Sequence, residues 1–451
     1  MLTKSPVTVG LVSLGCAKNL VDTQVMCGVM LTEGVELAPN PDEADVVLIN
    51  TCAFIEAARE EADFEINRAV ELKKNGQIGG IIVAGCLTQR YGKTLAAKYP
   101  DVDAWLGIDH IEEIATLAKK IASSRSARKR PFVSVSAPAV GLFEPRIPSL
   151  SITGGPFAYL RIAEGCNHAC AYCAIPGIRG KLRSRQSEAI VSEAEELLAA
   201  GVRELDIVAQ DVTAYGRDIR GGARLPQLLA ALDDLRGRYW TRILYGYPSL
   251  VDDALLESFS ALKHLCRYID IPIQHSHPDI LRLMRRADTI GAVESLPSRL
   301  RSACPGIAIR TTCLVGFPGE TEEHFKALCD FVREAKFDDL GVFAFSCEEG
   351  TAAAALPGQV PSEVAEERRD RLMRIQKKVA SAAARARVGK KAKALLLRPL
   401  SSGKWEARTE FQAPDVDGVT IVSGCKPTAK VGDFVTVTLT GVKGYDFSAR
   451  T

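Results

Sequence analysis

The sequence predicts a multidomain α/β protein with three structural parts. Its 451 residues suggest about three domains. Two long stretches alternate strand-like and helix-like segments, which is the pattern of a parallel sheet covered by helices, and the C-terminal stretch holds only short strands and turns. We therefore expect an N-terminal open parallel α/β sheet at residues 5–122, a linker at 123–150, a central partial (β/α)6 barrel at 151–387 and a small antiparallel β-barrel at 388–451.

The N-terminal domain is expected to form an open sheet because apolar, β-branched segments alternate with amphipathic ones. The helical stretches run from Val21 to Thr32, from Phe54 to Lys74 and from Thr88 to Lys98. The strand candidates are VTVGLVSL (7–14), DVVLINT (45–51), GGIIVAG (79–85) and AWLG (104–107).

The segment from Ser123 to Pro148 is expected to be a linker. It is rich in serine, proline and basic side chains and shows no apolar periodicity. Basic runs of this kind usually stay solvated or touch a partner. The basic residues concerned are Arg125, Arg128, Lys129 and Arg130.

The central stretch, from Phe157 to about Arg387, predicts about six βα units. Six units are too few for a closed eight-stranded barrel, so we expect an open partial barrel with a wide mouth. A long charged helix from Ser362 to Arg387 ends the series. The strand candidates are FAYLRIAEG, VRELDIVAQ, TRILYGYP, YIDIPIQH, IAIRTTCLVGFP and GVFAFSC.

The C-terminal stretch predicts a small antiparallel barrel of OB-like size, because short strands and turns follow one another from Ala392 onward. Between Ala394 and Thr451 the sequence contains seven basic and six acidic side chains. The sequence therefore reveals no basic stripe of the kind that neutralises RNA phosphates. The strand candidates are KALLLRPL, KWEARTEF, GVTIV and FVTVTLTGV.

Composition indicates a cytoplasmic protein with no membrane partner. The formal net charge of +2 argues against polyanion binding by net charge alone. The thirteen cysteines, an odd number scattered through a long chain, do not resemble a disulfide framework. No apolar run reaches the length that a bilayer requires, and the first residues, MLTKSPVTVG, lack the apolar core of a signal peptide.

Three cysteines within eight residues, Cys166, Cys170 and Cys173, form the most informative pattern in the chain. Such a loop can hold three irons of a [4Fe–4S] cluster, and because these clusters normally take four cysteines, one iron keeps an open position. Open metal positions are where chemistry takes place. One alternative is a helical face of buried thiols, which the flanking glycine and proline residues disfavour. Another is zinc, whose structural sites usually take paired C-x2-C motifs and four ligands.

A second set of cysteines, Cys16, Cys52 and Cys86, closes three predicted strands of the N-terminal domain. In open parallel sheets, ligands bind beyond the carboxyl ends of the strands. Glycines directly before two of these cysteines suit tight turns around a bulky inorganic group. We therefore expect a second metal site there. We interpret the other cysteines as packing residues: Cys27, Cys266, Cys304, Cys313, Cys329, Cys347 and Cys425.

The C-x3-C-x2-C spacing, with Tyr172 directly before the last cysteine, resembles the signature of the radical S-adenosylmethionine enzymes. With the N-terminal three-cysteine domain and a C-terminal barrel that looks like a TRAM domain, nearly the whole chain is similar to the methylthiotransferases of that superfamily. The resemblance rests on SLGCAKNLVDTQ, LINTCAFIEAARE, IPGIRGKLRSR, VAQDVTAYG, IPIQH and LVGFPGET.

The resemblance implies two [4Fe–4S] clusters and S-adenosylmethionine as cofactors. The loop cysteines are the implied catalytic ligands, which bind the cluster that generates the radical. The strand-end cysteines are the implied ligands of a second cluster that carries or supplies sulfur. Contacts to S-adenosylmethionine are expected at Tyr172, Gln210 and Arg310, although a structural carboxylate is the alternative partner of Arg310. Asp211 either orients substrate or caps the following helix.

Three features favour the branch of the family that modifies the β-carbon of an aspartate in small-subunit ribosomal protein twelve. They are Asp211 within VAQDVTAYG, the QAPDVDG and GYDF segments of the tail, and the near-neutral barrel. The implied partners are that ribosomal protein, free or on the assembled ribosome, and an external electron donor. Two rival functions stay open: a tRNA adenosine methylthiotransferase, and a non-catalytic iron–sulfur sensor that binds RNA through its barrel.

Basic residues that follow the cysteine loop have two interpretations. They either steer an anionic partner, such as ribosomal RNA around the substrate protein, or form a solvated turn. The residues are Arg179, Lys181, Arg183 and Arg185.

Overall fold

The computed structural model describes residues 6–53, 55–123, 130–139 and 153–451. The chain forms two compact units. The first comprises residues 1–152 with 164–168 and 173–183, and the second comprises 153–163, 169–172 and 184–451. Of the predicted linker basic residues, Arg125, Arg128 and Lys129 lie outside the described residues, as does Phe54 at the start of a predicted helix.

The first unit contains a parallel sheet in which the described strands follow the order β2-β1-β3-β4-β5-β6. All of its strand pairs are parallel, as the alternating pattern predicts. The two central strands β3 and β4 are buried along their whole length. The strands are β1 (Thr8–Ser13), β2 (Glu36–Leu37), β3 (Val46–Thr51), β4 (Gly80–Gly85), β5 (Ala104–Leu106) and β6 (Phe132–Ser134).

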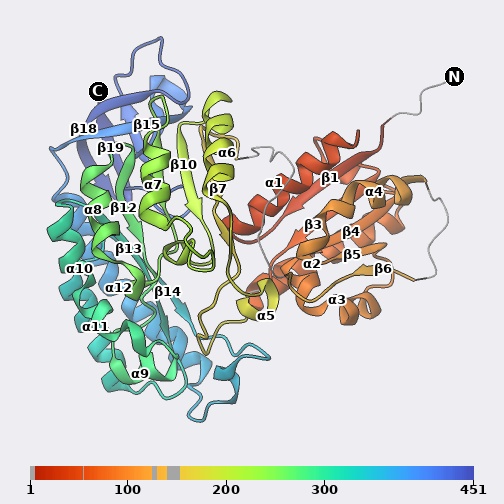
Figure 1. Cartoon of the computed structure of the whole chain (residues 1–451), viewed down its shortest axis with the longest axis horizontal. Helices are drawn as coiled ribbons and strands as arrows, with labels where there is room; N and C mark the ends of the chain where they lie inside the picture. Colours follow the sequence, from red (N-terminus) through yellow and green to blue (C-terminus); the bar gives the residue numbers. More distant parts are fainter. Residues whose placement is uncertain (1–5, 54, 124–129, 140–152) are drawn as a thin grey trace. The chain divides into compact units, whose positions relative to one another are not determined.

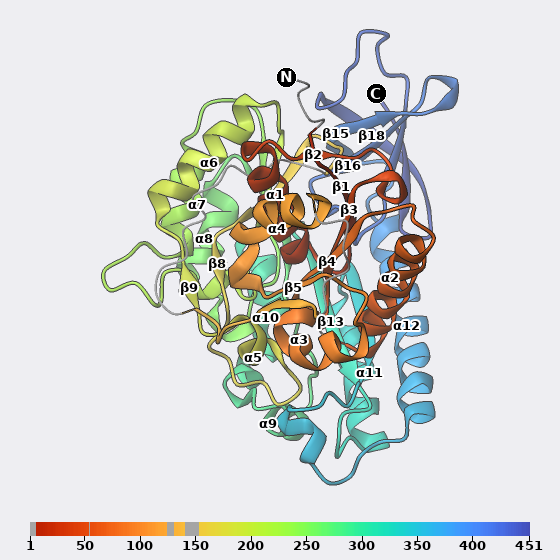
Figure 2. The same ribbon diagram turned by 90° about the vertical axis from the view of Figure 1, so that its right-hand side faces the viewer.

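Helices cover both faces of this sheet (Figure 2). Apolar side chains of α1 (Ala17–Thr32) and α4 (Ile114–Ser123) pack with one set of strand residues. Those of α2 (Glu56–Lys74) and α3 (Cys86–Lys98) pack with the alternate set. Because successive side chains of a strand point to opposite faces, a fully buried strand such as β3 supplies both cores.

Two strands of this sheet were not expected. The two-residue strand β2 is too short to produce a pattern, and β6 lies inside the range predicted as a linker. The linker prediction is wrong at β6, where the FVS segment pairs in parallel with β5. Phe132 and Val133 have the β-propensity that a strand needs, but a three-residue strand between polar stretches gives too little periodicity to detect.

The second unit contains a parallel sheet of the described strands in the order β14-β13-β12-β11-β10-β7 (Figure 1). Each of the six predicted strand segments contributes one strand to this sheet, and the sheet does not close on itself. The expected partial barrel is therefore confirmed. The strands are β7 (Phe157–Arg161), β10 (Glu204–Val208), β11 (Trp240–Ile243), β12 (Leu265–Asp270), β13 (Ala308–Val315) and β14 (Asp339–Ala344).

Helices connect these strands and lie outside the sheet (Figure 1). The last and longest of them, α12 (Ser362–Arg385), packs along β14 and beside α11 (Glu322–Ala335). The others are α6 (Ser187–Ala199), α7 (Leu225–Asp233), α8 (Asp253–Ala261), α9 (Pro278–Leu283) and α10 (Ile290–Ala303). Around the cysteine loop the chain forms β8 (Ala163–Glu164), α5 (Ile175–Arg179) and β9 (Arg183–Ser184).

The C-terminal residues form a closed barrel in the order β15-β16-β17-β19-β18. The predicted small barrel is confirmed with one correction: β17 and β19 pair in parallel, so the barrel is not wholly antiparallel. The strand β19 was not predicted, because its alternating DFSAR segment is only five residues long. The strands are β15 (Lys391–Pro399), β16 (Trp405–Thr409), β17 (Thr420–Ser423), β18 (Phe434–Lys443) and β19 (Asp446–Arg450).

Buried charges join this barrel to the central sheet within the second unit. Glu204, the first residue of β10, accepts hydrogen bonds from Arg242 of β11 at 2.8 Å and from Arg408 of the barrel. All three side chains are at most 4 % exposed. Burial and the charge of Glu204 raise the pKa of the neighbouring Asp206 well above its usual value. The barrel is thus attached near the amino-terminal ends of the central strands.

None of the helices in the described ranges has both the length and the apolar character that crossing a membrane requires.

Candidate functional site

The three strand-end cysteines of the first unit lie at one edge of its sheet. Cys16 is the N-cap residue of α1 after β1, Cys52 directly follows β3, and Cys86 is the first residue of α3 after β4. The strands β1, β3 and β4 are direct neighbours and run parallel. Their carboxyl ends therefore meet at the same edge, as the sequence predicts.

Two glycines allow the backbone to approach closely at this edge. Gly15 has φ +92°, and a Cβ atom there would lie 2.6 Å from Cys52 Cβ and 3.2 Å from its Sγ. Gly85 has φ +97°, and its Cβ would lie 2.3 Å from Asn50 Oδ1. Since only glycine adopts such φ values without strain, both positions need glycine. The Gly15 turn, directly before Cys16, therefore lies against Cys52.

A buried arginine, Arg179 of α5, also reaches this edge within the first unit. Its guanidinium donates to Asp22 at 2.7 Å, to Glu164 at 3.0 Å and to Cys86 Sγ at 3.1 Å. The side chains of Arg179, Asp22 and Glu164 are 3–5 % exposed. A buried cation with two carboxylates is therefore fixed against one of the three thiols.

The surroundings act differently on two of these thiols. Cys16 is exposed, but protein atoms around its thiol exclude part of the water, and this desolvation by itself would raise the pKa of the thiol. Lys18, Arg179 and backbone N–H groups outweigh that effect, so the pKa of Cys16 is lowered. Burial raises the pKa of Cys86 to about 12, which Arg179 partly offsets.

The donor set at this edge fits an iron–sulfur cluster. Three cysteines lie at the same sheet edge. Arg179 provides a positive charge that favours thiolates, and soft thiolate ligands are those that such clusters take. Three cysteine ligands would leave one iron of such a cluster without a cysteine.

Replacing Arg179 by glutamine is expected to destabilise the first unit by about 3–5 kcal/mol, because Asp22 and Glu164 stay buried without their cation. Thermal unfolding followed by circular dichroism measures the change. The matched control is Lys181→Gln, since Lys181 lies two residues away and is exposed. Equal melting temperatures for the two variants would contradict the role of the buried ion pairs.

Both interpretations of the basic residues after the cysteine loop are wrong for three of the four. Arg179 is buried as described above. Arg183 is buried and lies 3.4 Å from Asp109, and Arg185 is buried and lies 2.6 Å from Glu193. Of the four, only Lys181 is exposed. These arginines are internal ion-pair partners, because a buried guanidinium needs carboxylate or carbonyl acceptors.

The segment that carries Cys166, Cys170 and Cys173 is a loop rather than a helical face, as predicted. Gly165, with φ +74°, starts it, and a Cβ there would lie 2.1 Å from the Lys181 carbonyl oxygen. The Cys166 N–H donates to the Gly180 carbonyl at 3.1 Å. The base of the loop is thus fixed to the chain that follows it.

An arginine that the sequence gave no signal for lies beside the loop within the second unit. Arg286 is buried, and its guanidinium lies 3.7 Å from Cys170 Sγ and 3.5 Å from the Tyr172 hydroxyl. It also packs over the ring of Tyr247 at 4.3 Å. In the sequence Arg286 follows another arginine after a short amphipathic stretch, which is typical of a solvated surface.

Two predicted residues of the second unit lie near carboxyl ends of strands. Tyr172 packs edge-on against Phe317, with ring centroids 6.5 Å apart, and Gln210 follows β10 by two residues. Asp211, next along the chain, accepts a hydrogen bond from the Thr213 N–H at 2.9 Å and caps a short 3-10 helix, Val212–Ala214. Asp211 therefore caps the following helix, which is one of the two roles predicted from the sequence.

Arg310 lies away from these residues, as the third residue of β13 near its amino end. Its guanidinium donates to Asp417 of the C-terminal barrel at 2.6 Å and to the Val416 carbonyl at 3.1 Å. The carboxylate partner expected from the sequence is therefore a structural aspartate. This position corrects the expected contact between Arg310 and S-adenosylmethionine, because carboxyl ends of strands carry the predicted ligand positions.

Of the cysteines interpreted as packing residues, five are buried and Cys425 is partly exposed, but Cys347 is exposed. The packing interpretation is wrong for Cys347, which follows the last central strand, where apolar neighbours in the sequence suggested a core position.

Comparison with known proteins assigns each part of the chain to a family. Residues 8–107 match uncharacterized protein family UPF0004, residues 160–332 match the radical SAM superfamily, and residues 388–451 match the TRAM domain. The first range covers β1 to β5, the second covers the end of β7 and β10 to β13, and the third covers the small barrel.

Curated relatives match over nearly the full length. One from Pelotomaculum thermopropionicum, named ribosomal protein uS12 methylthiotransferase RimO, is 43% identical over 448 residues, which cover 99% of each chain. A protein of the same name from Elusimicrobium minutum is 43% identical over 439 residues, covering 97% of this chain and 98% of the relative.

Solved structures share the fold at low identity. The cobalamin-dependent S-adenosylmethionine radical enzyme OxsB superimposes with a TM-score of 0.53 at 13% identity, over 83% of this chain and 56% of that one. The radical S-adenosylmethionine methyltransferase TsrM from Kitasatospora setae gives a TM-score of 0.51 at 16% identity, over 75% and 72%. Because its curated relatives named RimO match it over nearly the full length at 43% identity, and its central part matches the radical SAM superfamily, this chain belongs to the RimO family of radical S-adenosylmethionine methylthiotransferases.

Proposed function

We propose that this chain adds a methylthio group to the β-carbon of an aspartate in ribosomal protein uS12. The observation that carries the proposal is the 43% identity to a uS12 methylthiotransferase across 99% of both chains. The convergence of Cys16, Cys52 and Cys86 at one sheet edge supports it, because this reaction needs a sulfur-bearing site in addition to a radical site.

In this proposal the two sets of cysteines bind two different clusters. Cys166, Cys170 and Cys173 hold one [4Fe–4S] cluster, and the strand-end cysteines hold the other. When bound, the clusters and S-adenosylmethionine supply an electron, a radical that abstracts hydrogen, a methyl group and sulfur. The chain positions the ligands: Gly165 fixes the base of the loop, and Arg179 holds a positive charge against Cys86.

Other residues and partners have secondary places in the proposal. Tyr172 and Gln210 contact S-adenosylmethionine, and Arg286 positions Cys170 and Tyr172. The N-terminal domain begins at 5 and extends past 122 to include β6, and the other two domains keep the bounds 151–387 and 388–451. An external electron donor reduces the clusters, the substrate protein is presented on the assembled ribosome, and the reaction takes place in the cytoplasm.

An anaerobic reaction tests the proposal. Reconstituted enzyme, S-adenosylmethionine and dithionite are incubated in parallel with small ribosomal subunits and with bulk tRNA, and mass spectrometry searches both for an added methylthio group. A modified aspartate in uS12 is the expected result. A modified tRNA adenosine would overturn the substrate, and failure to form 5′-deoxyadenosine with both clusters intact would overturn the enzyme assignment in favour of a sensor.

A further inference from the structure

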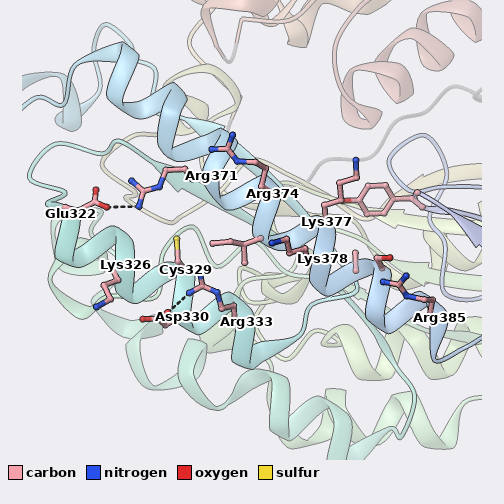
Figure 3. Close-up of a pocket in the computed structure, with 15 residues that line it drawn as sticks. Glu322, Lys326, Cys329, Asp330, Arg333, Arg371, Arg374, Lys377, Lys378 and Arg385 are labelled. Atoms are coloured by element: carbon pink, nitrogen blue, oxygen red, sulfur yellow. Dashed lines mark hydrogen bonds and ion pairs between the residues drawn. The ribbon is translucent and has the colours of Figure 1, made fainter.

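A broad groove lies between α11, α12 and the turn that joins β18 to β19 in the second unit (Figure 3). Its volume is about 870 Å³. The turn contributes Gly444 and Tyr445, and the helices contribute the rest of the lining. None of the cysteines predicted to bind a cluster lines this groove. The proposed reaction therefore assigns the groove no role.

Positive charge dominates the lining. Seven basic side chains line the groove: Lys326, Arg333, Arg371, Arg374, Lys377, Lys378 and Arg385. The lining contains two carboxylates, which pair with two of these cations: Glu322 with Arg371 at 2.8 Å and Asp330 with Arg333 at 2.5 Å. The other five basic side chains are exposed and have no ion-pair partner among the described residues.

The cations on α12 form a row rather than a scattered set. Arg371, Arg374, Lys378 and Arg385 are separated by three, four and seven residues, which places them on one face of a helix. The row extends over about 21 Å at the usual rise per residue. Figure 3 shows these side chains along α12, beside Lys326 and Arg333 of α11.

An aromatic ring lies at the barrel end of the groove. Tyr445 is 37% exposed, although it is a large side chain on a short turn. Exposed tyrosine rings beside basic side chains are suited to stacking on unpaired bases. The groove therefore offers both a row of cations for a phosphate backbone and a ring for a base.

We propose that this groove binds the phosphate backbone of RNA and so docks the enzyme on ribosomal RNA near its substrate protein. The inference rests on the proposed function, because a ribosomal substrate is surrounded by RNA. Five unpaired cations on two neighbouring helices, four of them on α12 and Lys326 on α11, are typical of phosphate neutralisation. An acidic protein segment is a weaker match, because it gives Tyr445 no base to stack on.

The test replaces three cations of the row, in the variant Arg374→Gln/Lys378→Gln/Arg385→Gln. Glutamine keeps a similar helix propensity. The probe is transcribed small-subunit ribosomal RNA, with affinity measured by filter binding between 50 and 200 mM KCl on the reconstituted full chain, about the range over which phosphate contacts change affinity most. We expect RNA affinity to fall about tenfold or more, and the slope of log affinity against log salt to fall by about one for each cation removed.

The matched control is Arg236→Gln/Arg267→Gln/Lys404→Gln, which removes three exposed cations of the same unit outside the groove. It is expected to bind RNA like the parent. Equal RNA affinity and salt slope for the groove variant and the parent would overturn the proposal. The proposal would also be overturned if the groove variant lost affinity for polyglutamate but kept its affinity for RNA. The occupant of the groove would then be an acidic protein.

A second measurement separates this inference from the proposed function. Both variants should still cleave S-adenosylmethionine to 5′-deoxyadenosine at the parent's rate. The groove variant should modify free uS12 normally and small subunits more slowly. If neither the parent nor either variant modifies uS12, the proposed function is wrong. The RNA-binding measurement still decides whether the groove binds RNA.

Discussion

Replacing Cys16, Cys52 and Cys86 together by alanine is expected to abolish methylthiolation of uS12 and to leave cleavage of S-adenosylmethionine intact. The three thiols lie at one edge of the N-terminal sheet, and alanine removes every thiolate that a cluster there would bind. The iron content should fall from about eight to about four atoms per chain, since each cluster contributes four. Iron analysis, 5′-deoxyadenosine formation and mass spectrometry of the substrate measure the three effects.

Cys27→Ala is the matched control for this variant. Cys27 lies in α1, the helix that begins directly after Cys16, but its side chain is fully buried among apolar residues. The control should keep the full iron content and full activity. If the triple variant kept about eight irons per chain, or if it still modified uS12, the strand-end cysteines would not be cluster ligands.

These cysteines could be predicted from the sequence because each directly follows an apolar, β-branched segment. Strand ends are visible in a sequence, and the carboxyl ends of neighbouring parallel strands must meet at one edge. The β1-β3-β4 neighbourhood that brings the three together follows from short right-handed connections. The same reasoning predicted six central strands, since each produced a recognisable apolar run.

Contacts between residues distant in sequence could not be predicted in this way. Arg179 pairs with Asp22, which precedes it by 157 residues, and nothing in a run of basic residues shows which of them will be buried. For Arg310 the sequence indicated the kind of partner but not which residue provides it. A costly arginine in an apolar strand correctly indicated a carboxylate partner, but only the structure shows that Asp417 of the barrel provides it.

Short strands were missed for a different reason. A two- or three-residue strand such as β2 or β6 contains no repeat of the apolar pattern, and its pairing is decided by the sheet that it joins. The parallel pairing of β17 with β19 likewise follows from barrel closure and leaves no local trace in the sequence.

Arg408→Met is expected to destabilise the second unit by about 3–5 kcal/mol, because it leaves Glu204 buried with one of its two cations removed. Glu204 is fully buried, and Arg408 also lies over the ring of Phe157 at 4.8 Å. Urea unfolding followed by tryptophan fluorescence measures the loss. Trp240 reports on this interface, since its ring packs against Phe434 of the barrel with centroids 4.8 Å apart.

Arg398→Met is the matched control, because Arg398 pairs with Glu406 of the same barrel at 2.6 Å but is 67% exposed. Exposed pairs contribute little in water, so the unfolding midpoint should not change. The double variant Glu204→Gln/Arg408→Met should lose less stability than Arg408→Met alone, because no carboxylate charge at position 204 is then left buried, and Arg242 keeps Asp206 at 3.5 Å. If both single variants unfolded at the parent's urea concentration, the buried ion pair would not be what attaches the barrel to the central sheet.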